Sequence, residues 1–543
     1  MNALLLITVF RMVVIPVEFE DRGFAAGREG QAQLVREAEA YFNRQFGEQA
    51  FEFVLGPQVK LEHAAAWYGA DYPDRRDVRL AEAVKEACTA VQGELDWSRF
   101  DGDGDGFVDN VMLLYAGPGQ QESGVADDLC PQQGRLSDGG GSALNIKNLK
   151  IDSFAVAPEG RLGIFCHEFG HVLGLPDLYD TDGGESGGTD RGLWGTSLMD
   201  EGCRRETPPD FGAVEFELLG LGRCDTLATG GCTLAPLLRE RRYLKALTGV
   251  EGEFFLFEAR TDGLHVFHVD RSENAAGRSP GHERELTARD RWDYGLVNNN
   301  PAHPCARPVP ADPDATDVRG LPFPGPGGFD SFGSDTPAAF RAWSGTAPGL
   351  ALTDIRPDGA GDVSFEVLEP ITLLDLSVYQ DAAVLRWKTD PALHGISGYL
   401  VRWSDGGQEW LRELPSGTTS CTLEGLSPGT EYRFSVQVRA GTRVRYSMDG
   451  SFTTKMQRGG MYPYIYLSGA TRNVDGSFPS GSKLPLRVFN AAEVQEVQWS
   501  LDGVPIEPEA DGRYTLRRSG VLRARILHTD GTAETLMKEI IVQ

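Results

Sequence analysis

The sequence predicts a multidomain fold in which an α/β domain is followed by a β-rich region and two β-sandwich domains. The chain of 543 residues is longer than the roughly 250–300 residues that one hydrophobic core supports. Strand and helix patterns alternate over the first 225 residues, whereas strand patterns dominate from about residue 370. Hydrophobic residues at 41% and charged residues at 24% are typical of a folded protein and exclude a largely disordered one.

The first domain is expected to span residues 1–225. We expect strands at residues 12–19 and 108–116, and helices at residues 31–45 and 79–92. Strands that alternate with helices are typical of a mostly parallel sheet covered by helices. The sequence therefore predicts an α/β domain here.

The second region, residues 226–369, changes to short apolar strands that long loops separate. Strands are expected at residues 254–259 and 264–269. Residues 298–328 are so rich in Pro, Asp and Gly that we expect loop throughout this segment. The region is therefore predicted to be a β-rich extension of the first domain.

Residues 370–455 carry the regular alternation of a β-sandwich. Its strands are expected at residues 383–388, 398–403, 420–423 and 432–440. Trp387, Tyr399 and the run Leu-Ser-Pro-Gly-Thr-Glu-Tyr that ends at Tyr432 resemble a fibronectin type III domain. That resemblance implies that Tyr432 forms the tyrosine corner of the family.

Residues 461–543 are predicted to form a second, immunoglobulin-like sandwich after a linker at residues 455–460. Its strands are expected at residues 464–467, 484–489, 494–501 and 521–528. We find no catalytic constellation in either sandwich. Both fit spacer or sorting modules, because the sandwich fold hosts many functions.

The charge balance excludes nucleic acid as an expected partner. The chain has 52 Lys and Arg against 79 Asp and Glu, a net charge of −27, and no basic run that would follow a phosphate backbone. The acidic excess fits a soluble secreted protein, and part of it fits calcium ligands.

The N-terminal apolar stretch predicts neither a transmembrane segment nor a signal peptide. Residues 3–9 and 12–17 are too short and too interrupted to cross a bilayer. A basic region before the stretch and a cleavage site after it are both missing. We expect residues 11–19 to be a buried strand, and an export signal is not visible.

Eight cysteines contain no C-x-x-C pair, so a cysteine-rich zinc cluster is not expected. Cys224 and Cys232 are close enough in sequence to close a short loop, whereas Cys421 is expected to be a buried thiol. The disulfide pairing stays open.

The segment His-Glu-Phe-Gly-His at residues 167–171 predicts a catalytic zinc site. His167 and His171 are four residues apart, so a helix places both imidazoles on one face. Glu168 follows the first histidine and occupies the position of a general base that takes a proton from water. The alternative without a metal is a helix with two surface histidines, but the apolar residues around the histidines indicate that they are buried and have a metal partner.

A third zinc ligand is expected at Asp177. Gly174 permits a sharp turn out of the helix, and Pro176 prevents the helix from continuing. Asp177 then folds back toward the metal, and a carboxylate oxygen binds zinc at about the same distance as an imidazole.

The string H-E-x-x-H-x-x-G-x-x-D resembles the metzincin signature, with aspartate in place of the usual third histidine. The segment at residues 194–199 resembles the methionine turn of that family. This resemblance implies a metzincin-like α/β domain in which Met199 forms an apolar floor beneath the zinc site.

The sequence of residues 167–180 closely resembles that of the immune inhibitor A-like metalloproteases. Further pieces of residues 12–368 resemble the same family. The resemblance implies a secreted bacterial zinc endopeptidase that acts on proteins or peptides.

The acidic loop at residues 101–109 predicts a calcium site. Carboxylates stand at loop positions 1, 3, 5 and 9, with Gly106 at position 6 and a backbone carbonyl at position 7. The ligands in order are Asp101, Asp103, Asp105, the carbonyl of Phe107 and Asp109. Position 12 is Met112 in place of the glutamate of an EF-hand, and the alternative is a solvated Asp/Gly turn.

These patterns together predict a secreted or cell-surface zinc endopeptidase with Zn²⁺ and Ca²⁺ as cofactors. Water activated by the metal and deprotonated by Glu168 would attack the peptide carbonyl. The rival hypothesis is a catalytically vestigial adhesin, whose sandwiches bind glycans or a cell surface.

Overall fold

The structure is a computed structural model of the chain. It describes residues 9–47, 49–72, 75–336, 338–393, 395–441, 443–456, 463–467, 470, 473 and 477–543. Most of the apolar stretch at residues 3–9 and of the linker at residues 455–460 lies outside the described residues.

The chain divides into two compact units. The first contains residues up to 227 together with residues 233–329 and 356–364. The second contains residues 228–232, 330–355 and 365–543.

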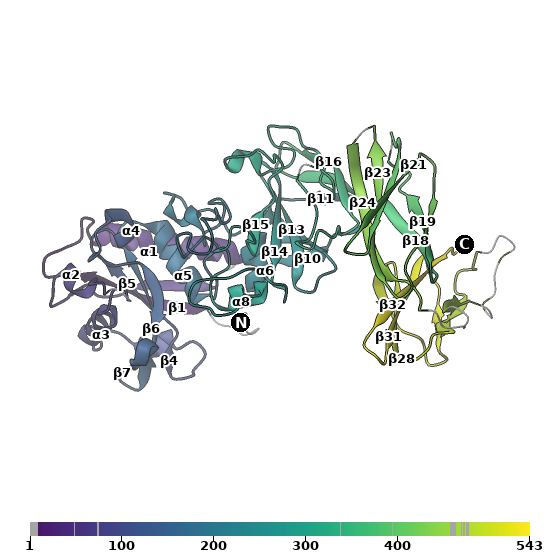
Figure 1. The fold of residues 1–543 in the computed structure, drawn as a ribbon. Coiled ribbons are helices and arrows are strands. Elements are labelled where there is room, and N and C mark those ends of the chain that lie inside the picture. Colours follow the sequence, from purple (N-terminus) through teal and green to yellow (C-terminus); the bar gives the residue numbers. More distant parts are fainter. Residues whose placement is uncertain are drawn as a thin grey trace. The chain divides into compact units, whose positions relative to one another are not determined.

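A mostly parallel sheet forms the centre of the first unit, as the sequence predicts (Figure 1). Its strands are β1 (Phe10–Glu18), β2 (Phe51–Leu55), β3 (Val59–Lys60), β5 (Val111–Tyr115), β6 (Gln132–Arg135) and β9 (Ser153–Pro158). The order is β2-β1-β5-β9-β6, and β3 also pairs with β1. All pairs are parallel except β6 with β9, so β6 is an antiparallel edge strand.

Helices cover both faces of this sheet because successive residues of its buried strands point to opposite faces. On one face, Met12 and Met112 pack against α1 (Arg28–Phe46) and α5 (Leu162–Val172). On the other face, Ile15 and Leu113 pack against α3 (Leu80–Ala90). The expected helices at residues 31–45 and 79–92 are therefore confirmed.

Shorter elements complete this α/β part. They are α2 (Ala65–Tyr68), α4 (Gln120–Ser123), α6 (Ala213–Leu219), the 3-10 helices Trp97–Phe100, Asp138–Gly140 and Glu201–Arg204, and the sheet of β4 (Phe107–Val108), β8 (Leu149–Ile151) and β7 (Leu144–Ile146). They carry most of the loops that surround the candidate sites.

A second sheet in the same unit has the order β10-β12-β13-β14-β15. Its elements and their neighbours are β10 (Arg223–Thr226), α7 (Leu237–Glu240), β12 (Arg242–Leu247), β13 (Glu253–Arg260), β14 (Gly263–Asp270), α8 (Ala288–Asp293) and β15 (Ala306–Pro308). Leu256 and Val269 of this sheet belong to the same hydrophobic core as α5. The extension is thus built into the core on which the α/β sheet packs.

The expectation of loop throughout residues 298–328 is wrong at two places. Ala306–Pro308 forms β15, because its backbone pairs with the free edge of β14, and Val318–Gly320 forms a 3-10 helix. Composition indicates a lack of regular structure but not where a neighbouring strand offers backbone partners.

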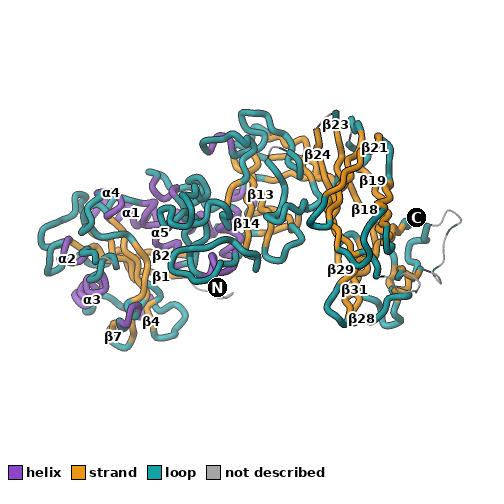
Figure 2. Tube along the Cα trace, in the orientation of Figure 1, coloured by secondary structure: helices purple, strands orange, loops and turns teal. Residues whose placement is uncertain are grey.

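Strands dominate the second unit (Figure 2). One sandwich contains the sheets β18-β19-β22 and β21-β20-β23-β24. Its strands are β18 (Ile371–Val378), β19 (Ala382–Thr389), β20 (Gly398–Ser404), β21 (Glu409–Pro415), β22 (Ser420–Glu424), β23 (Glu431–Ala440) and β24 (Arg443–Thr453). The hydroxyl oxygen of buried Tyr432 accepts a hydrogen bond from the backbone N–H of Ser427 at 3.0 Å, which is the geometry of a tyrosine corner.

The C-terminal part has a sheet of order β29-β28-β31-β32 and two short pairs, β25 with β27 and β26 with β30. The strands are β25 (Tyr464–Tyr466), β26 (Lys483–Pro485), β27 (Arg487–Phe489), β28 (Val494–Leu501), β29 (Val504–Ile506), β30 (Arg513–Thr515), β31 (Gly520–His528) and β32 (Ala533–Ile540). Leu484, Leu501 and Leu522 lie in one shared core. The remaining strands, β11 (Gly230–Leu234), β16 (Ala351–Pro357) and β17 (Val363–Leu368), form a sheet of order β11-β17-β16.

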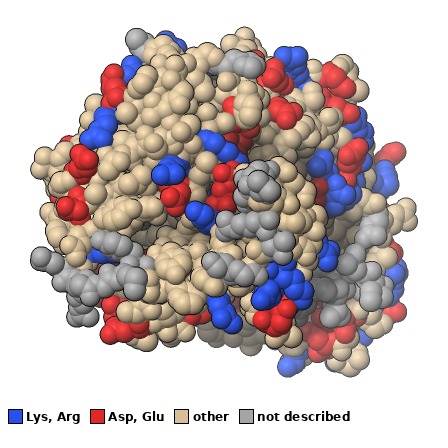
Figure 3. All heavy atoms as spheres, turned by 90° about the vertical axis from the view of Figure 1, so that its right-hand side faces the viewer, with Lys and Arg blue, Asp and Glu red and all other residues tan. Residues whose placement is uncertain are grey.

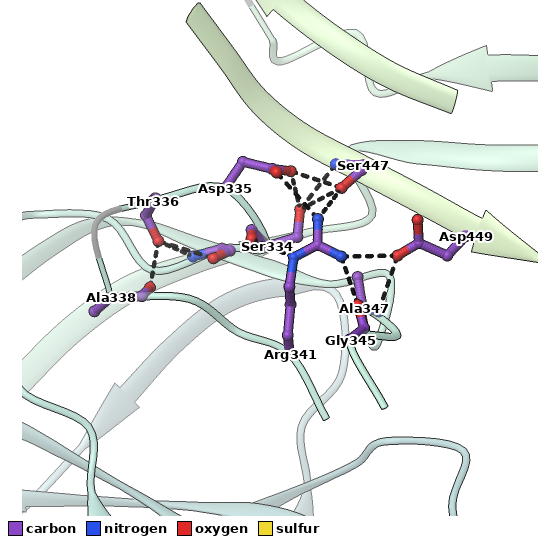
Figure 4. A network of polar contacts seen from close by, with 10 residues as sticks. Ser334, Asp335, Thr336, Ala338, Arg341, Gly345, Ala347, Ser447 and Asp449 are labelled. Carbon is purple, nitrogen blue, oxygen red and sulfur yellow. Dashed lines mark hydrogen bonds and ion pairs between the residues drawn. The ribbon is translucent and has the colours of Figure 1, made fainter. Parts of the chain in front are cut away.

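A polar network within the second unit joins residues 334–347 to β24 (Figure 4). Arg341 reaches the carboxylates of Asp449 at 2.9 Å and Asp335 at 3.0 Å. The backbone N–H of Ser447 donates to the hydroxyl of Ser334 at 2.8 Å. The segment that precedes the fibronectin-like strands is therefore held to them by charge-assisted hydrogen bonds.

Acidic and basic side chains are interspersed on the face that Figure 3 shows. Among the described residues, none of the helices is long and apolar enough to cross a membrane. All eight cysteines are free thiols, so Cys224 and Cys232 do not form the short loop considered above.

Candidate metal centre

The zinc helix of the sequence analysis is α5, and its end is built as the sequence predicts. Gly174 adopts a left-handed conformation with φ 92°, which a residue with a side chain rarely adopts. Its N–H donates to the carbonyl of His171 at 2.9 Å, and the N–H of Leu175 donates to the carbonyl of Gly170 at 3.1 Å. These bonds close the helix and turn the chain back toward its own histidine face.

The turn brings His167, His171 and Asp177 together. One carboxylate oxygen of Asp177, Oδ1, lies 3.1 Å from Nε2 of His167 and 3.4 Å from Nε2 of His171. One potential ligand atom from each of the three residues lies within 4.8 Å of the others. They therefore form a compact cluster of two nitrogens and one oxygen.

Backbone carbonyls fix the orientation of both imidazoles. Nδ1 of His167 lies 3.0 Å from the carbonyl oxygen of Leu198, and Nδ1 of His171 lies 2.8 Å from that of Leu175. A carbonyl oxygen only accepts, so each Nδ1 must carry the proton and donate. This tautomer leaves the lone pair of each Nε2 directed at the cluster, as a metal ligand requires.

The donor set fits a zinc ion. Ligands about 2.0–2.2 Å from a tetrahedral zinc lie roughly 3.3–3.6 Å apart, which is close to the separations from Asp177. Oδ1 of Asp177 is buried and makes no hydrogen bond, although such atoms in proteins nearly always have a partner. Burial opposes ionisation of the Asp177 carboxyl, but when the imidazoles of His167 and His171 are protonated, their hydrogen bonds and charge hold its pKa below the ordinary value. The carboxylate is thus ready to bind a cation.

Glu168 lies in the same cavity as the three ligands. The cavity has a volume of about 870 Å³, and its walls include the side of α5 that carries both histidines. The side chain of Glu168 is almost fully buried, and this burial raises the pKa of its carboxyl group. A carboxylate whose pKa is raised toward neutrality is suited to accept a proton and return it.

Other cavity residues come from distant segments that no motif marks. Cys130 precedes the edge strand β6 and Gln132 begins it. Cys203 belongs to the 3-10 helix after the methionine segment, and Tyr294 follows α8 of the extension. Tyr294 is 52% exposed at the cavity. Sequence reasoning assigned no role to Cys203 and Tyr294, because only the tertiary fold brings them to the cavity.

Met199 packs directly beneath α5, as the resemblance to a methionine turn implies. It is fully buried, and a Cβ atom added at Gly170 would lie 2.5 Å from its sulfur. The glycine within the His-Glu-Phe-Gly-His segment therefore makes room for the thioether. The neighbouring carbonyl of Leu198 is the one that orients His167.

The acidic loop brings together three of its four carboxylates. Oxygen atoms of Asp101, Asp103 and Asp109 lie within 4.8 Å of one another, whereas Asp105 is not part of this group. Asp105 and Phe107 instead contact each other, because the N–H of Phe107 donates to the Asp105 carboxylate at 2.7 Å. Gly106 has φ 89°, so the expected tight turn is present.

Two observations fit a cation in this loop. Oδ1 of Asp101 is buried without a hydrogen-bond partner. Burial and the neighbouring carboxylates raise the pKa of Asp109 to about 6. Both effects are those of acidic groups held together without a counter-ion.

Fold and site together indicate the class of protein: an α/β domain with a cluster of two histidines and one aspartate that could hold a metal ion, followed by β-sandwich modules. Residues 17–209 match the family described as immune inhibitor A peptidase M6, catalytic domain, and residues 369–448 match the fibronectin type III domain. The chain therefore contains a peptidase M6 catalytic domain and a fibronectin type III domain.

Curated relatives match the peptidase part over short stretches. Immune inhibitor A of Bacillus thuringiensis subsp. alesti is 34% identical over 148 residues, which is 22% of this chain and 22% of that protein. Pre-pro-metalloprotease PrtV of Vibrio cholerae is 30% identical over 145 residues, which is 22% of this chain and 16% of that protein. The matches thus span less than a quarter of each relative.

Solved structures match a sandwich-sized part of the chain. A computationally redesigned β-sandwich protein is 29% identical, with a TM-score of 0.15, over 16% of this chain and 94% of that one. A fibronectin type III domain of human collagen XX is 27% identical, with a TM-score of 0.14, over 15% of this chain and 86% of that one.

Proposed function

We propose that this chain is a zinc-dependent endopeptidase of the metzincin-like kind. The observation that carries the proposal is the convergence of His167, His171 and Asp177 on one point, with Glu168 in the same cavity. The peptidase M6 domain over residues 17–209 supports the same activity.

The residues of the site would divide the reaction among them. Zinc held by His167, His171 and Asp177 would supply Lewis-acid polarisation of the peptide carbonyl and of the attacking water. Glu168 takes one proton from that water as its oxygen forms a bond to the carbonyl carbon. The same carboxyl group then delivers the proton to the leaving amine nitrogen as the peptide C–N bond breaks.

The sheet edge beside the cavity fits a peptide substrate. Strand β6 is the terminal strand of its sheet, and Gln132 and Gln133 of this strand line the cavity. An edge strand offers backbone N–H and C=O groups with which an extended peptide can pair. We propose that the substrate lies along β6 and places its scissile bond over the metal centre.

The decisive experiment replaces Glu168 by Gln. The substitution keeps the shape of the side chain but removes the proton acceptor, so cleavage of casein is expected to fall about 10²- to 10⁴-fold while zinc stays bound. Glu201→Gln is the matched control, because Glu201 lines the same cavity but pairs with Arg204 at 3.1 Å. Undiminished cleavage by Glu168→Gln with bound zinc would contradict the mechanism.

We also propose that the acidic loop binds calcium through Asp101, Asp103 and Asp109, with Asp105 and the Phe107 carbonyl as further candidates. A bound Ca²⁺ would neutralise the carboxylates and fix the loop beside β4. Isothermal titration of calcium into protein whose zinc site is saturated tests this proposal. The proposal would be refuted if the wild-type protein gave no heat signal, or if Asp109→Asn gave the same signal as the wild type.

Export and the role of the sandwiches remain proposals. We propose a secreted or cell-surface protein, in keeping with the likeness to immune inhibitor A peptidases, and fractionation of producing cells tests it. The sandwiches are proposed as spacers, with surface glycans as the alternative partners. Glycan binding by the full chain without any proteolysis would instead favour the adhesin hypothesis.

A further inference from the structure

The segment that carries the proposed third zinc ligand has no regular structure of its own. Residues 175–181 follow the end of α5 without forming a helix or a strand. The position of Asp177 must therefore be set by contacts that its neighbours make with other parts of the unit. Leu178, the next residue along the chain, makes these contacts through its backbone.

Both polar backbone groups of Leu178 are bonded. Its N–H donates to the carbonyl of Met199 at 2.8 Å, and its carbonyl accepts from Nδ2 of Asn298 at 2.9 Å. The side chain of Leu178 is fully buried in the core that also contains Met199. The residue after Asp177 is thus held from the methionine segment on one side and from the β-rich extension on the other.

Asn298 is itself rigidly held. Its side chain is fully buried, and Nδ2 also donates to the carbonyl of Ala306 at 2.7 Å. Its Oδ1 accepts from the N–H of Ala306 at 3.0 Å. Ala306 lies in β15 and pairs with Val269 of β14, so the amide is anchored on a strand of the second sheet.

The next asparagine adds a second contact to the same segment. Oδ1 of buried Asn299 accepts from the N–H of Thr181 at 3.2 Å and from its hydroxyl at 3.1 Å. Two successive side chains of the extension therefore hold the chain on the far side of Asp177. A ligand on an irregular segment needs such support, because outer contacts set the geometry of metal ligands.

We propose that Asn298 is a positioning residue of the metal centre, which sets the place of Asp177 by holding the carbonyl of Leu178. This inference rests on the proposed zinc site. It assigns an indirect part in metal affinity to Asn298 of the β-rich extension, which lies 120 residues after Leu178 in the sequence. Asn298 touches neither the metal ligands' donor atoms nor the cavity, so its effect must pass through Leu178.

The test compares Asn298→Ala with Asn300→Ala. Asn300 is a matched control, because it lies in the same loop and its Nδ2 donates to the carbonyl of Ala276 at 2.9 Å, away from the zinc segment. Zinc affinity is measured by competition with a chromophoric chelator in the full chain. Asn298→Ala is expected to weaken zinc binding by about 10- to 100-fold, whereas Asn300→Ala leaves it within about threefold.

A spectroscopic measurement separates positioning from general destabilisation. The visible absorption of the Co²⁺-loaded protein reports the geometry of its ligands. It is expected to change in Asn298→Ala and to stay unchanged in Asn300→Ala, even where both variants unfold at lower temperature. If Asn298→Ala does not fold, Asn298→Ser removes the same donor with a smaller loss of volume and carries the same expectation.

The possible results are distinguishable. Wild-type protein that binds no zinc would overturn the proposed function and this inference with it. Wild-type protein that binds zinc, together with an Asn298 variant of unchanged affinity and unchanged Co²⁺ spectrum, would overturn the inference alone.

Discussion

Ser197 donates a hydrogen bond to the carboxyl group of Glu215, which is completely buried on α6. The hydroxyl of Ser197 also accepts from the N–H of Met199 at 2.9 Å. The carbonyl of Leu198, between these two residues, orients His167. Glu215 therefore supports the methionine segment, whose Leu198 carbonyl orients the proposed zinc ligand His167.

Ser197→Ala is expected to destabilise the protein and to weaken zinc binding. The substitution leaves Oε1 of buried Glu215 and the buried N–H of Met199 without their hydrogen bonds, although the N–H of Gly212 still donates to Oε2. The loss costs about 1–3 kcal/mol of unfolding free energy. Urea unfolding and chelator competition measure the two effects. Ser272→Ala is the control, because that serine is equally buried but bonds Asn274 far from the site, so it should leave zinc affinity unchanged.

Gly170→Ala is expected to lower stability by about 1–3 kcal/mol, although alanine ordinarily favours a helix. The added methyl group would collide with the sulfur of Met199. The double variant Gly170→Ala/Met199→Ala should therefore cost less than the sum of the two single variants. Additive losses of unfolding free energy would show that the two side chains do not meet.

The calcium-free protein is expected to lose stability as pH rises from about 4 to about 7. The pKa of Asp109 is raised to about 6 in the folded protein, mainly by burial, and is near 3.8 when unfolded. A group whose folded pKa is raised favours folding while protonated, and this contribution disappears as pH passes the folded pKa. Unfolding temperatures measured over this range test the slope.

Calcium and Asp109→Asn serve as opposite controls for that slope. Saturating Ca²⁺ should remove the loss, because the cation stabilises the ionised carboxylates. Asp109→Asn should flatten the slope without calcium and abolish the response to calcium. If neither change alters the dependence of the unfolding temperature on pH, other titratable groups cause that dependence.

Arg341→Met is expected to destabilise the second unit by about 2–3 kcal/mol, because it leaves the carboxylates of Asp335 and Asp449 without their cation. Circular dichroism during urea unfolding of the full chain measures the loss. Arg402→Met is a suitable control, since its single contact with Glu409 is exposed and should contribute less than 1 kcal/mol.

The local sequence was sufficient to predict that the three proposed zinc ligands converge and that the acidic loop makes a tight turn at Gly106. Four-residue spacing on one helix places His167 and His171 together, and Gly174 with Pro176 returns the chain toward them. Such features depend on backbone geometry over a few residues. The alternation of strands with helices in the first domain, and the in-and-out alternation along the fibronectin-like strands, were predictable for the same reason.

The partners that complete the metal centre could not be predicted in this way. Tyr294 of the extension lines the cavity, Asn298 of the extension holds the carbonyl of Leu178, and the carbonyl of Leu198 carries no sequence signal at all. Backbone atoms are common to every residue, and buried asparagines have many structural uses. Their roles follow only when the second sheet is seen to share a core with α5.

The open edge of β6 sets a requirement on whatever enters the cavity. A helix, or a strand inside a sheet, has already used its own backbone groups and has none to offer to this strand. Our proposal therefore implies that folded proteins are poor substrates until a segment of several residues is released. Cleavage should concentrate in flexible loops and unfolded chains, so the conformation of the target would govern the choice of site as much as its side chains.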